Sequence, residues 1–132
     1  MTNMSASQSN SASDFQARVL AAQEMQERVR DTNQRLHINA DGSVRLFHST
    51  SAANMQAILQ QGHFAGNTWF GASKSATIPH AKPKHGDETR TLEIPVEPRD
   101  IEFSTGTGEF YAPNGLKRHV DGIWRDAGSQ PE

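Results

Sequence analysis

The stretch Leu46-Phe47-His48-Ser49-Thr50-Ser51 decides how the rest of the chain is interpreted. Residues 44–47 are apolar and β-branched at their start, which is typical of a short buried strand. This strand is expected to end on His48 and a run of hydroxyl side chains. A histidine followed by hydroxyls at the end of a buried strand indicates a site as well as a core.

The segment that follows, residues 52–62, predicts a helix. Its apolar side chains recur at helical spacing, and they are Ala52, Met55, Ile58 and Leu59. Ser51 suits the N-cap position, and Gly62 suits the left-handed residue that ends a helix. His48 and Thr50 are therefore expected at a strand-to-helix corner, where side chains and helix N–H groups can converge on an anionic ligand.

Length and composition limit the classes of protein to which the chain can belong. The chain has 132 residues, 34% of them hydrophobic, and a mean hydropathy of −0.71, which suits one domain with a single core. No stretch approaches the ~20 apolar residues of a membrane span, so we expect no membrane association. The absence of cysteine excludes disulfides and thiolate metal sites. A formal charge of −2 argues against general binding to nucleic acid or acidic membranes.

The N-terminal third is expected to lie outside the main domain. Residues 1–13 are almost all Ser, Asn, Ala, Thr and Gln and predict a flexible tail without a standard signal peptide. We therefore expect a cytoplasmic chain, or one delivered into a target cell by another route. Residues 14–43 predict a helical arm and linker that begins with Asp14 as a cap and ends in a turn. The expected apolar face of the arm is Phe15, Val19, Ala22, Met25 or Gln26, and Val29. The helix over 14–35 is a candidate docking segment for a partner.

Short strands dominate the rest of the sequence. Residues 73–77 can start a helix that Pro79 would interrupt or end, and residues 79–88 are expected to form a polar loop. The expected strands are 68–70, 89–96, 101–103, 109–112 and 119–125. Early helices followed by strands indicate an α+β domain over 44–126, with a C-terminal tail over 127–132. We expect two small sheets that meet at a cleft, with the helix over 52–61 beside it.

The chain resembles the ADP-ribosyltransferase superfamily, in particular the branch whose three motifs carry a histidine, an aromatic residue and an acid. Phe47-His48-Ser49-Thr50 followed by Ile58-Leu59-Gln60-Gln61-Gly62 is similar to the first motif and its helix. Trp69-Phe70-Gly71-Ala72-Ser73-Lys74-Ser75-Ala76 looks like the second motif. Gly108-Glu109-Phe110-Tyr111 is similar to the third. The resemblance covers residues 44–125.

This resemblance implies a fold, a substrate and a set of site residues. The implied fold is a split β-sheet core with flanking helices, here preceded by an N-terminal helical arm. The implied substrate is NAD, whose ADP-ribose would pass to a protein or nucleic-acid acceptor, as in small toxins and effectors. The implied catalytic residues are Glu109 and His48. The implied NAD-binding residues are His48, Ser49, Thr50, Trp69, Phe70 and Ser73.

Two positions depart from the family pattern. Trp69 stands where the family usually has tyrosine, and Phe70 follows it, which leaves open the ring that faces nicotinamide. Thr107 stands where many relatives have a second acid or glutamine that helps to select arginine-type acceptors. The preferred acceptor is therefore left open as well.

The chemistry of these residue types agrees with what the resemblance implies. Cleavage of the nicotinamide–ribose bond passes through an oxocarbenium-like centre, which a carboxylate such as Glu109 can stabilise. An aromatic face can stack on nicotinamide. His48 can bind ribose hydroxyls, and the backbone of Ser49 can bind the carboxamide.

Each of these residues also has a purely structural interpretation. His48 could be a satisfied structural histidine, Trp69 and Phe70 could be core, and Glu109 is one of several acids, which include Glu93, Glu97 and Glu102. His80 and His85 are interpreted as solvated loop residues, because no third metal ligand accompanies them. Three alternatives to the transferase stay open: an NAD glycohydrolase, an NAD-dependent RNA 2′-phosphotransferase, and an inactive module that binds ADP-ribose or a partner.

Overall fold

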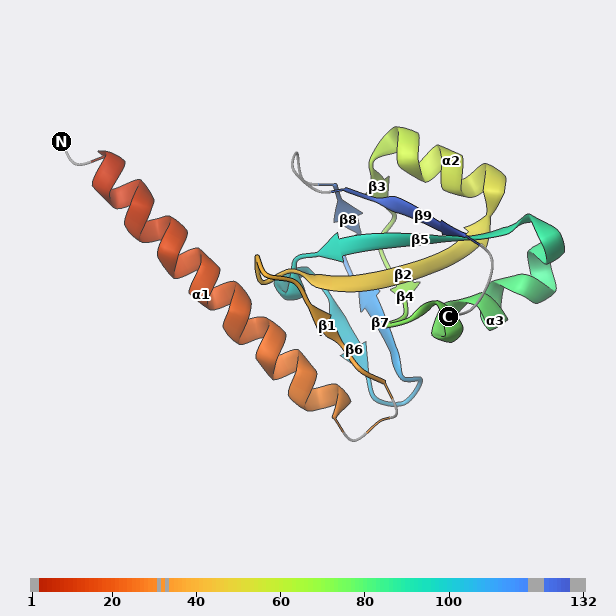
Figure 1. The fold of residues 1–132 in the computed structure, drawn as a ribbon, viewed down its shortest axis with the longest axis horizontal. Helices are drawn as coiled ribbons and strands as arrows, with labels where there is room; N and C mark the ends of the chain where they lie inside the picture. The colour runs from red at the N-terminus through yellow and green to blue at the C-terminus, as the bar shows by residue number, and fades with distance from the viewer. Residues whose placement is uncertain (1–2, 31, 33, 119–122, 129–132) are drawn as a thin grey trace.

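The described residues fold into a mixed α+β structure in which three helices surround antiparallel sheets (Figure 1). The computed structural model describes residues 3–30, 32, 34–118 and 123–128. The helices are α1 (Asn3–Val29), α2 (Ala52–Gln61) and α3 (Lys74–His85), with short 3-10 turns η1 (Gly86–Glu88) and η2 (Pro98–Asp100). The strands are β1 (His37–Ile38), β2 (Val44–Ser51), β3 (His63–Phe64), β4 (Thr68–Phe70), β5 (Thr89–Val96), β6 (Glu102–Ser104), β7 (Glu109–Ala112), β8 (Leu116–Lys117) and β9 (Arg125–Gly128). The α+β class expected from the sequence is confirmed.

The described residues form two larger sheets and one separate pair of strands. The four-stranded sheet has the order β1-β2-β5-β9, the three-stranded sheet has the order β4-β7-β6, and β3 pairs with β8. The two larger sheets connect where Phe47 of β2 exchanges backbone hydrogen bonds with Gly71, at N···O distances of 2.8 and 2.9 Å. Beyond this bridge the strands diverge, which leaves room for a ligand between them.

The opening stretch of the sequence forms a longer strand than expected. β2 continues past Phe47 to Ser51, because β5 pairs with it residue by residue as far as Thr89. His48 and Thr50 therefore lie within the strand rather than in a corner after it. The helix that follows has the expected caps: the Ser51 hydroxyl accepts a hydrogen bond from the Asn54 N–H, and Gly62 has a left-handed backbone with φ of 70°.

A row of phenylalanines marks the face of the three-stranded sheet that is buried. Phe70, Phe110 and Phe103 lie directly opposite one another on β4, β7 and β6, and all three are buried in the core. Directly opposed residues point to the same face of a sheet, while their neighbours along each strand point to the other face. The neighbouring row, which includes Trp69 and Tyr111, must therefore face outward.

Helix α3 differs from the sequence expectation. It runs through Pro79 and Pro83 to His85, where a polar loop over 79–88 was expected. Proline inside a helix costs about 3 kcal/mol or more, because it removes one hydrogen bond and crowds the preceding turn. Both prolines lie on the exposed side of α3, whereas Ile78 and Ala81 are buried beneath it. The burial of this inner face offsets the two prolines, so the helix continues.

Helix α1 also differs from the expectation. It begins at Asn3, so most of the tail expected over 1–13 is helical, and Asp14 lies inside the helix instead of capping it. Once a helix exists, each added residue gains one hydrogen bond without a new nucleation cost. Figure 1 shows the N-terminal half of α1 extending past the sheets, while Ala22, Met25 and Val29 join the common hydrophobic core. The arm expected over 14–43 is thus packed onto the domain.

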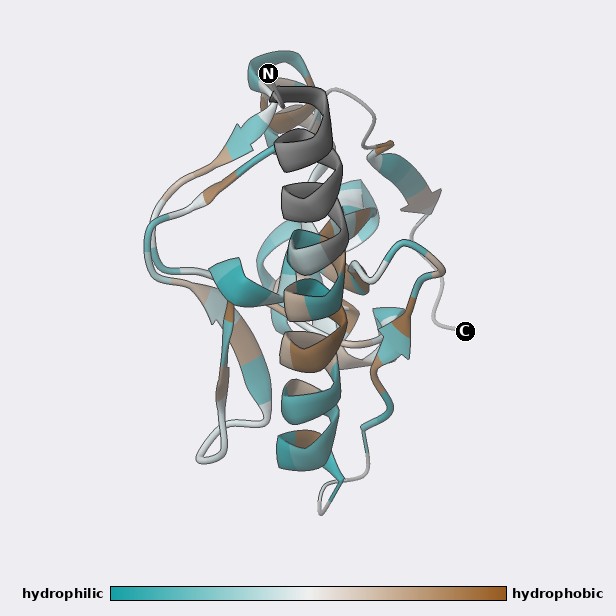
Figure 2. Cartoon of the chain, turned by 90° about the vertical axis from the view of Figure 1, so that its left-hand side faces the viewer, coloured by the Kyte–Doolittle hydropathy of each residue, from teal (hydrophilic) through white to brown (hydrophobic). Residues whose placement is uncertain are grey.

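The apolar face of α1 is narrower than the sequence suggested. Phe15, expected on the packed face, is 45% exposed, and Leu20 is 56% exposed. Figure 2, which looks onto α1, shows that hydrophobic residues gather in the middle of the helix. Among the side chains of α1 that the structure describes, the buried ones are Ala22, Met25 and Val29, all in the C-terminal half of the helix.

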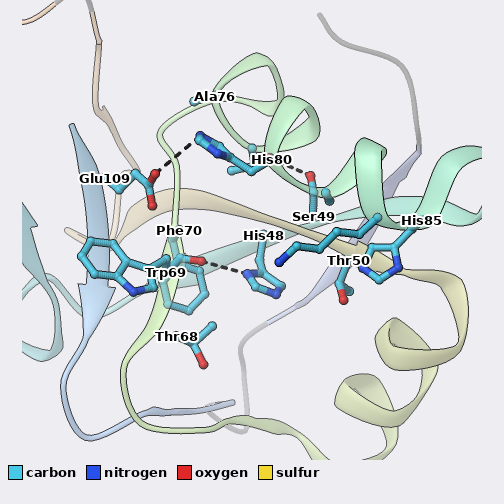
Figure 3. Close-up of a pocket in the computed structure, with 13 residues that line it drawn as sticks. His48, Ser49, Thr50, Thr68, Trp69, Phe70, Ala76, His80, His85 and Glu109 are labelled. Carbon is cyan, nitrogen blue, oxygen red and sulfur yellow. Dashed lines mark hydrogen bonds and ion pairs between the residues drawn. The ribbon is translucent and has the colours of Figure 1, made fainter. Parts of the chain in front are cut away.

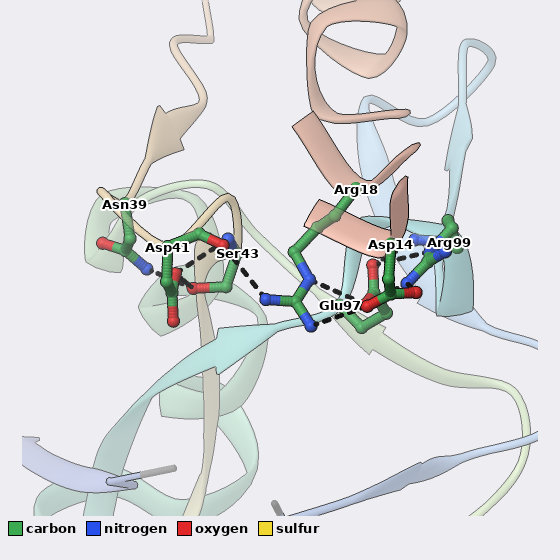
Figure 4. A network of polar contacts seen from close by, with 7 residues as sticks. All are labelled: Asp14, Arg18, Asn39, Asp41, Ser43, Glu97 and Arg99. Atoms are coloured by element: carbon green, nitrogen blue, oxygen red, sulfur yellow. Dashed lines mark hydrogen bonds and ion pairs between the residues drawn. The ribbon is translucent and has the colours of Figure 1, made fainter. Parts of the chain in front are cut away.

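An ion-pair network fixes α1 to the domain (Figure 4). The Glu97 Oε1 atom accepts hydrogen bonds from Arg18 Nε and Arg99 Nη2, each at 2.9 Å, and Arg99 Nη2 also donates to Asp14 Oδ1 at 2.8 Å. Arg18 Nη1 donates to the backbone carbonyl of Asp41, in the turn before β2, at 3.0 Å. Helix α1 is therefore held at η2 and at this turn together.

The C-terminal part is only partly described. The strand expected over 119–125 falls largely on residues 119–122, which lie outside the described residues. The strand that the structure does show, β9, begins at Arg125 and pairs with β5. It takes in Ala127 and Gly128, which were expected in the tail over 127–132; residues 129–132 also lie outside the described residues.

Candidate active site

A cavity of about 430 Å³ lies where β2, β4, β7 and α3 come together (Figure 3). Six of the residues expected in the site line this cavity, and they are His48, Ser49, Thr50, Trp69, Phe70 and Glu109. They come from three strands that are far apart in the sequence. The structure thus brings the three motifs to one cleft between the two larger sheets.

His48 occupies the middle of the cleft. Its Nδ1 atom lies 2.8 Å from the backbone carbonyl oxygen of Trp69, and its ring packs at 5.2 and 5.6 Å from the rings of Phe64 and Phe70. A carbonyl only accepts, so Nδ1 carries a proton and Nε2 of the neutral ring is an acceptor. Burial lowers the pKa of His48, although the bond to the Trp69 carbonyl opposes this shift. His48 is therefore a neutral, oriented acceptor at neutral pH.

Ser49 can serve a ligand only through its backbone. Its hydroxyl lies 2.7 Å from the Thr77 hydroxyl and 2.8 Å from the Thr91 hydroxyl, so it is used in packing α3 against the sheet. Backbone N–H and C=O groups alternate between the two sides of a strand. Those of Phe47 point toward Gly71, so those of Ser49 point to the same side, where β4 has diverged and the cleft opens.

Thr50, unlike Ser49, can offer its side chain to a ligand. Its side chain is buried, and its hydroxyl oxygen accepts a hydrogen bond from the Asn54 side-chain amide of α2 at 2.8 Å. The hydroxyl proton is still available for donation, since a hydroxyl can both donate and accept. Because Thr50 lines the cleft, this proton can reach a ligand there.

The two aromatic residues of β4 have different surroundings. Phe70 is 1% exposed and packs on Phe64 at a centroid distance of 5.0 Å, so it belongs mainly to the core. Trp69 is 42% exposed and lies 5.0 Å from the ring of Tyr111. Both rings border the cavity, but Trp69 has the larger accessible face. Of the two rings that the sequence left open, Trp69 is the one with a face available for stacking.

Glu109 opens β7 and reaches the cleft from the three-stranded sheet. Its carboxylate is 28% exposed, and its Oε1 atom lies 3.5 Å from Nε2 of His80 on α3 (Figure 3). Figure 3 shows Glu109 and Trp69 at one end of the cleft, His48 in the middle and His85 at the other end. Glu109 is the only Asp or Glu among the residues that line this cavity in the described part of the chain.

The sequence interpretation missed the wall that α3 contributes. His80, Lys84 and His85 line the cavity, whereas the sequence placed them in a solvated loop. The expectation that Pro79 ends the helix caused this error. The spacing of Ala76, His80 and Lys84, each four residues after the last, is the signal that could have placed them on one helix face.

Ser73 is the predicted site residue that the structure places elsewhere. It is the N-cap of α3, and its hydroxyl oxygen accepts a hydrogen bond from the Ala76 N–H at 3.2 Å. Ser73 lines a separate pocket with Arg45 and Phe47, not the cleft. An N-cap serine is committed to the helix it caps, which explains why this position of the second motif does not reach the cleft.

Two kinds of feature are absent from the residues that the structure describes. Within these residues no group of three or more His, Cys, Asp or Glu side chains is arranged to hold a metal ion. Among the described residues, none of the helices combines the length and apolar character needed to cross a bilayer.

Comparison of the chain with models of protein families, with curated protein sequences and with solved structures gives no match. The residues of the cleft therefore carry the functional proposal by themselves.

Proposed function

We propose that the protein is a mono-ADP-ribosyltransferase that binds NAD in the cleft between the two larger sheets. The observation that carries this proposal is the meeting of His48 and Glu109 in one cavity, from two different sheets. A carboxylate and a neutral histidine in one cleft can together stabilise and hold the ribose during cleavage of the nicotinamide–ribose bond. An ADP-ribosyltransferase-like split-sheet core is part of the same proposal.

The reaction begins with the rupture of the C1′–N bond of NAD. The bonding electrons leave with the pyridine nitrogen, so nicotinamide departs as a neutral molecule and positive charge develops on the ribose. Glu109 stabilises this charge and accepts a hydrogen bond from a ribose hydroxyl. Nε2 of His48 accepts a hydrogen bond from a second hydroxyl, which holds the ribose while the bond breaks. An acceptor nucleophile then bonds to C1′ and gives up a proton.

The nicotinamide ring has a complementary position beside these groups. Trp69 offers an exposed aromatic face at the Glu109 end of the cleft. The backbone N–H and C=O of Ser49, which point into the cleft, match the C=O and NH₂ of the carboxamide. The pairing of a flat ring and a carboxamide with these partners supports nicotinamide as the bound group.

The charge distribution along the cleft also suits NAD. The carboxylate of Glu109 lies at one end, and His85 lies at the other end, next in sequence to Lys84. NAD carries its developing positive charge at the nicotinamide ribose and its negative charge at the pyrophosphate. An NAD molecule with its ribose at Glu109 and its pyrophosphate toward the end of α3 satisfies both charges.

Release of nicotinamide from NAD by the purified chain tests the proposal. Chromatography of the products should show nicotinamide, together with ADP-ribose or an ADP-ribosylated acceptor. Glu93→Gln is the matched control for Glu109→Gln, because Glu93 is a half-buried strand carboxylate of the other sheet, outside the cleft. Release by the parent and the control but not by Glu109→Gln supports the transferase. If the parent binds NAD without releasing nicotinamide under any condition, the chain is a binding module instead.

A further inference from the structure

A second pocket, also of about 430 Å³, lies beside the beginning of α3 and shares no lining residue with the cleft. Its walls come from the segment between α1 and β1, from β1 and β2, and from the segment that precedes α3. Its polar lining residues are Gln34, Arg35, His37, Arg45 and Ser73, and none of the described residues that line it is Asp or Glu. We refer to this cavity as the second pocket.

The four-stranded sheet holds Arg45 at the second pocket. His37 of β1 lies directly opposite Arg45 of β2, and Phe47 is two residues further along β2, so the three side chains share one face of the sheet. The guanidinium carbon of Arg45 lies 5.9 Å from the centroid of the Phe47 ring, a cation–π contact that fixes the guanidinium beside the pocket. Ser73, the N-cap of α3, also lines the pocket, so the helix end that favours negative charge borders it.

Arg45 carries a positive charge that the described residues leave unpaired. Among their ion pairs none includes Arg45, and although Glu93 lies on the same face of the sheet, it is not within 4.0 Å of the guanidinium. The Nε atom of Arg45 is buried and has no hydrogen-bond partner within this part of the chain. A buried donor without an acceptor is unfavourable. An anion in the pocket that draws the guanidinium toward itself would satisfy this donor.

Gln34 supplies an unpaired acceptor at the same pocket. Its Nε2 atom donates a hydrogen bond to the backbone carbonyl of Gly108, and because a carbonyl oxygen only accepts, this bond fixes the orientation of the amide. The Oε1 atom of Gln34 is buried without a partner among the described residues. Of the three buried side-chain atoms in this condition, two therefore belong to residues of the second pocket, one a donor and one an acceptor. A matching ligand both accepts and donates hydrogen bonds.

The chemistry of the second pocket selects a phosphate carried on a sugar. The planar forks of Arg35 and Arg45 match the oxygens of a phosphate group, and His37 adds a further ring N–H donor. An ionised carboxylate alone would only accept and would leave Oε1 of Gln34 unpaired. The hydroxyl of a sugar can donate to this oxygen. The volume of the pocket lies within the range of about 300–1,000 Å³ that small-molecule sites have.

We propose that the second pocket binds a sugar phosphate, with the phosphate group on Arg35 and Arg45 and a sugar hydroxyl on Oε1 of Gln34. The site lies outside the cleft and needs no reaction at Glu109. The inference therefore goes beyond the proposed transferase activity and does not depend on it.

An NMR titration of the ¹⁵N-labelled full chain tests the site. The probes are ribose 5-phosphate, inorganic phosphate and ribose, each added at the same ionic strength. Backbone amide signals of residues 35–37 and 72–73 report on the second pocket, and those of residues 48–50 and of Trp69 report on the cleft. Separate reporters are needed because Lys84 of the cleft also attracts phosphate.

We expect ribose 5-phosphate to shift the signals of the second pocket saturably, with a Kd several-fold lower than that of inorganic phosphate, and ribose to leave them unchanged. Arg45→Gln should raise the Kd about 10- to 100-fold, the range for loss of a charged hydrogen bond. Arg35→Gln should raise it several-fold, because an exposed charge is screened by solvent.

Arg90→Gln is the matched control for Arg45→Gln and should keep the parental Kd. Arg90 is also a half-buried strand arginine of the four-stranded sheet, but its Nη1 atom donates to the carbonyls of Asp87 and Thr89 at 3.1 and 2.9 Å. Circular dichroism checks that each variant is folded. If Arg45→Gln does not fold, Arg35→Gln decides, because its side chain is exposed.

Four results overturn the inference. Signals of the second pocket that do not shift, or that shift only together with an unchanged Kd in the folded variants of Arg35 and Arg45, reject the site. An equal rise of Kd in Arg90→Gln shows attraction by net charge alone and also rejects it. Equal Kd values for ribose 5-phosphate and inorganic phosphate reject the sugar phosphate as the ligand. Each result is read without NAD, so failure here is distinct from failure of the transferase proposal.

Discussion

Substitution of Glu109 by glutamine is the change that probes the proposed chemistry most sharply. The substitution keeps the length and shape of the side chain and removes its negative charge. The amide oxygen of the new side chain would still accept a hydrogen bond from a ribose hydroxyl, so NAD binding should survive. The charge that stabilises the oxocarbenium-like transition state is lost, and turnover should fall.

The expected decrease in kcat follows from the partial burial of the Glu109 carboxylate. Two unit charges about 4 Å apart interact by about 4 kcal/mol at an effective dielectric constant of about 20. The Glu109 side chain is 28% exposed, and the ribose carries only part of a unit charge in the transition state, so the effect is smaller. Loss of one such contact typically costs about 2.7–4 kcal/mol, which is 10²- to 10³-fold in kcat. We expect kcat to fall within this range and the Kd for NAD to change by less than about threefold.

Two measurements on the same preparations separate turnover from binding. Nicotinamide release at saturating NAD gives kcat, and calorimetric titration at low temperature gives Kd. Glu93→Gln serves as the control and should match the parent in both. A parental kcat for Glu109→Gln would refute the role of Glu109, and so would a loss of rate that is matched by an equal loss of affinity.

Four further substitutions test the site and the packing. Phe70→Ala should destabilise the fold by about 3–5 kcal/mol, because the ring is buried in the core. Trp69→Ala should keep the fold and weaken NAD binding. Equal decreases in Tm for the two variants would contradict this difference. His48→Ala should weaken NAD binding by about 1 kcal/mol or a little more, through loss of a ribose hydrogen bond, and an unchanged Kd in calorimetry would remove His48 from the site. Burial acts to raise the pKa of Glu97, but hydrogen bonds from Arg99 and Arg18 outweigh it and hold this pKa below its usual value. The ionised carboxylate therefore stabilises the fold at pH values above the ordinary pKa of a glutamate. This contribution is lost as the pH falls through the lowered pKa of Glu97. Urea unfolding from pH 7 to pH 3 should show a steeper loss of stability in the parent than in Glu97→Gln, and parallel curves would count against the network.

The local chemistry of the sequence predicted the elements around the first motif well. Ser51 and Gly62 bound α2 as expected, because caps act through hydrogen bonds within a few residues of the helix end. Residues 89–96 form β5 as expected, and Thr91 is buried within this strand. The extension of β2 to Ser51 depends on its pairing with β5, a long-range contact that a local pattern does not contain.

The errors in the helices share one physical cause. The end expected at Pro79 and the tail expected over 1–13 were both inferred from local preference or composition. In α3, burial of Thr77, Ile78 and Ala81 outweighs the prolines. In α1, elongation from the packed C-terminal half carries the helix to Asn3. Tertiary packing and helix elongation are not visible in a window of a few residues.

The sequence predicted several of the residues that line the cleft but not those that α3 contributes. Three residues of predicted strands, namely His48, Trp69 and Glu109, meet in the cleft. Ser73, which was also predicted, does not line the cleft, because its N-cap role commits its hydroxyl to α3. The wall formed by His80 and Lys84 was left out, because it exists only when α3 continues past Pro79. Whether the six lining residues bind NAD stays a prediction.

A crystal structure of Glu109→Gln with NAD tests the central claim most directly, because the slow variant should retain the intact dinucleotide. We predict nicotinamide against Trp69, its carboxamide on the Ser49 backbone and its ribose between His48 and the substituted side chain at position 109. We also predict the pyrophosphate toward the end of α3. NAD bound with its ribose away from His48 and position 109, or a cleft that stays empty at saturating NAD, would contradict the proposed mechanism.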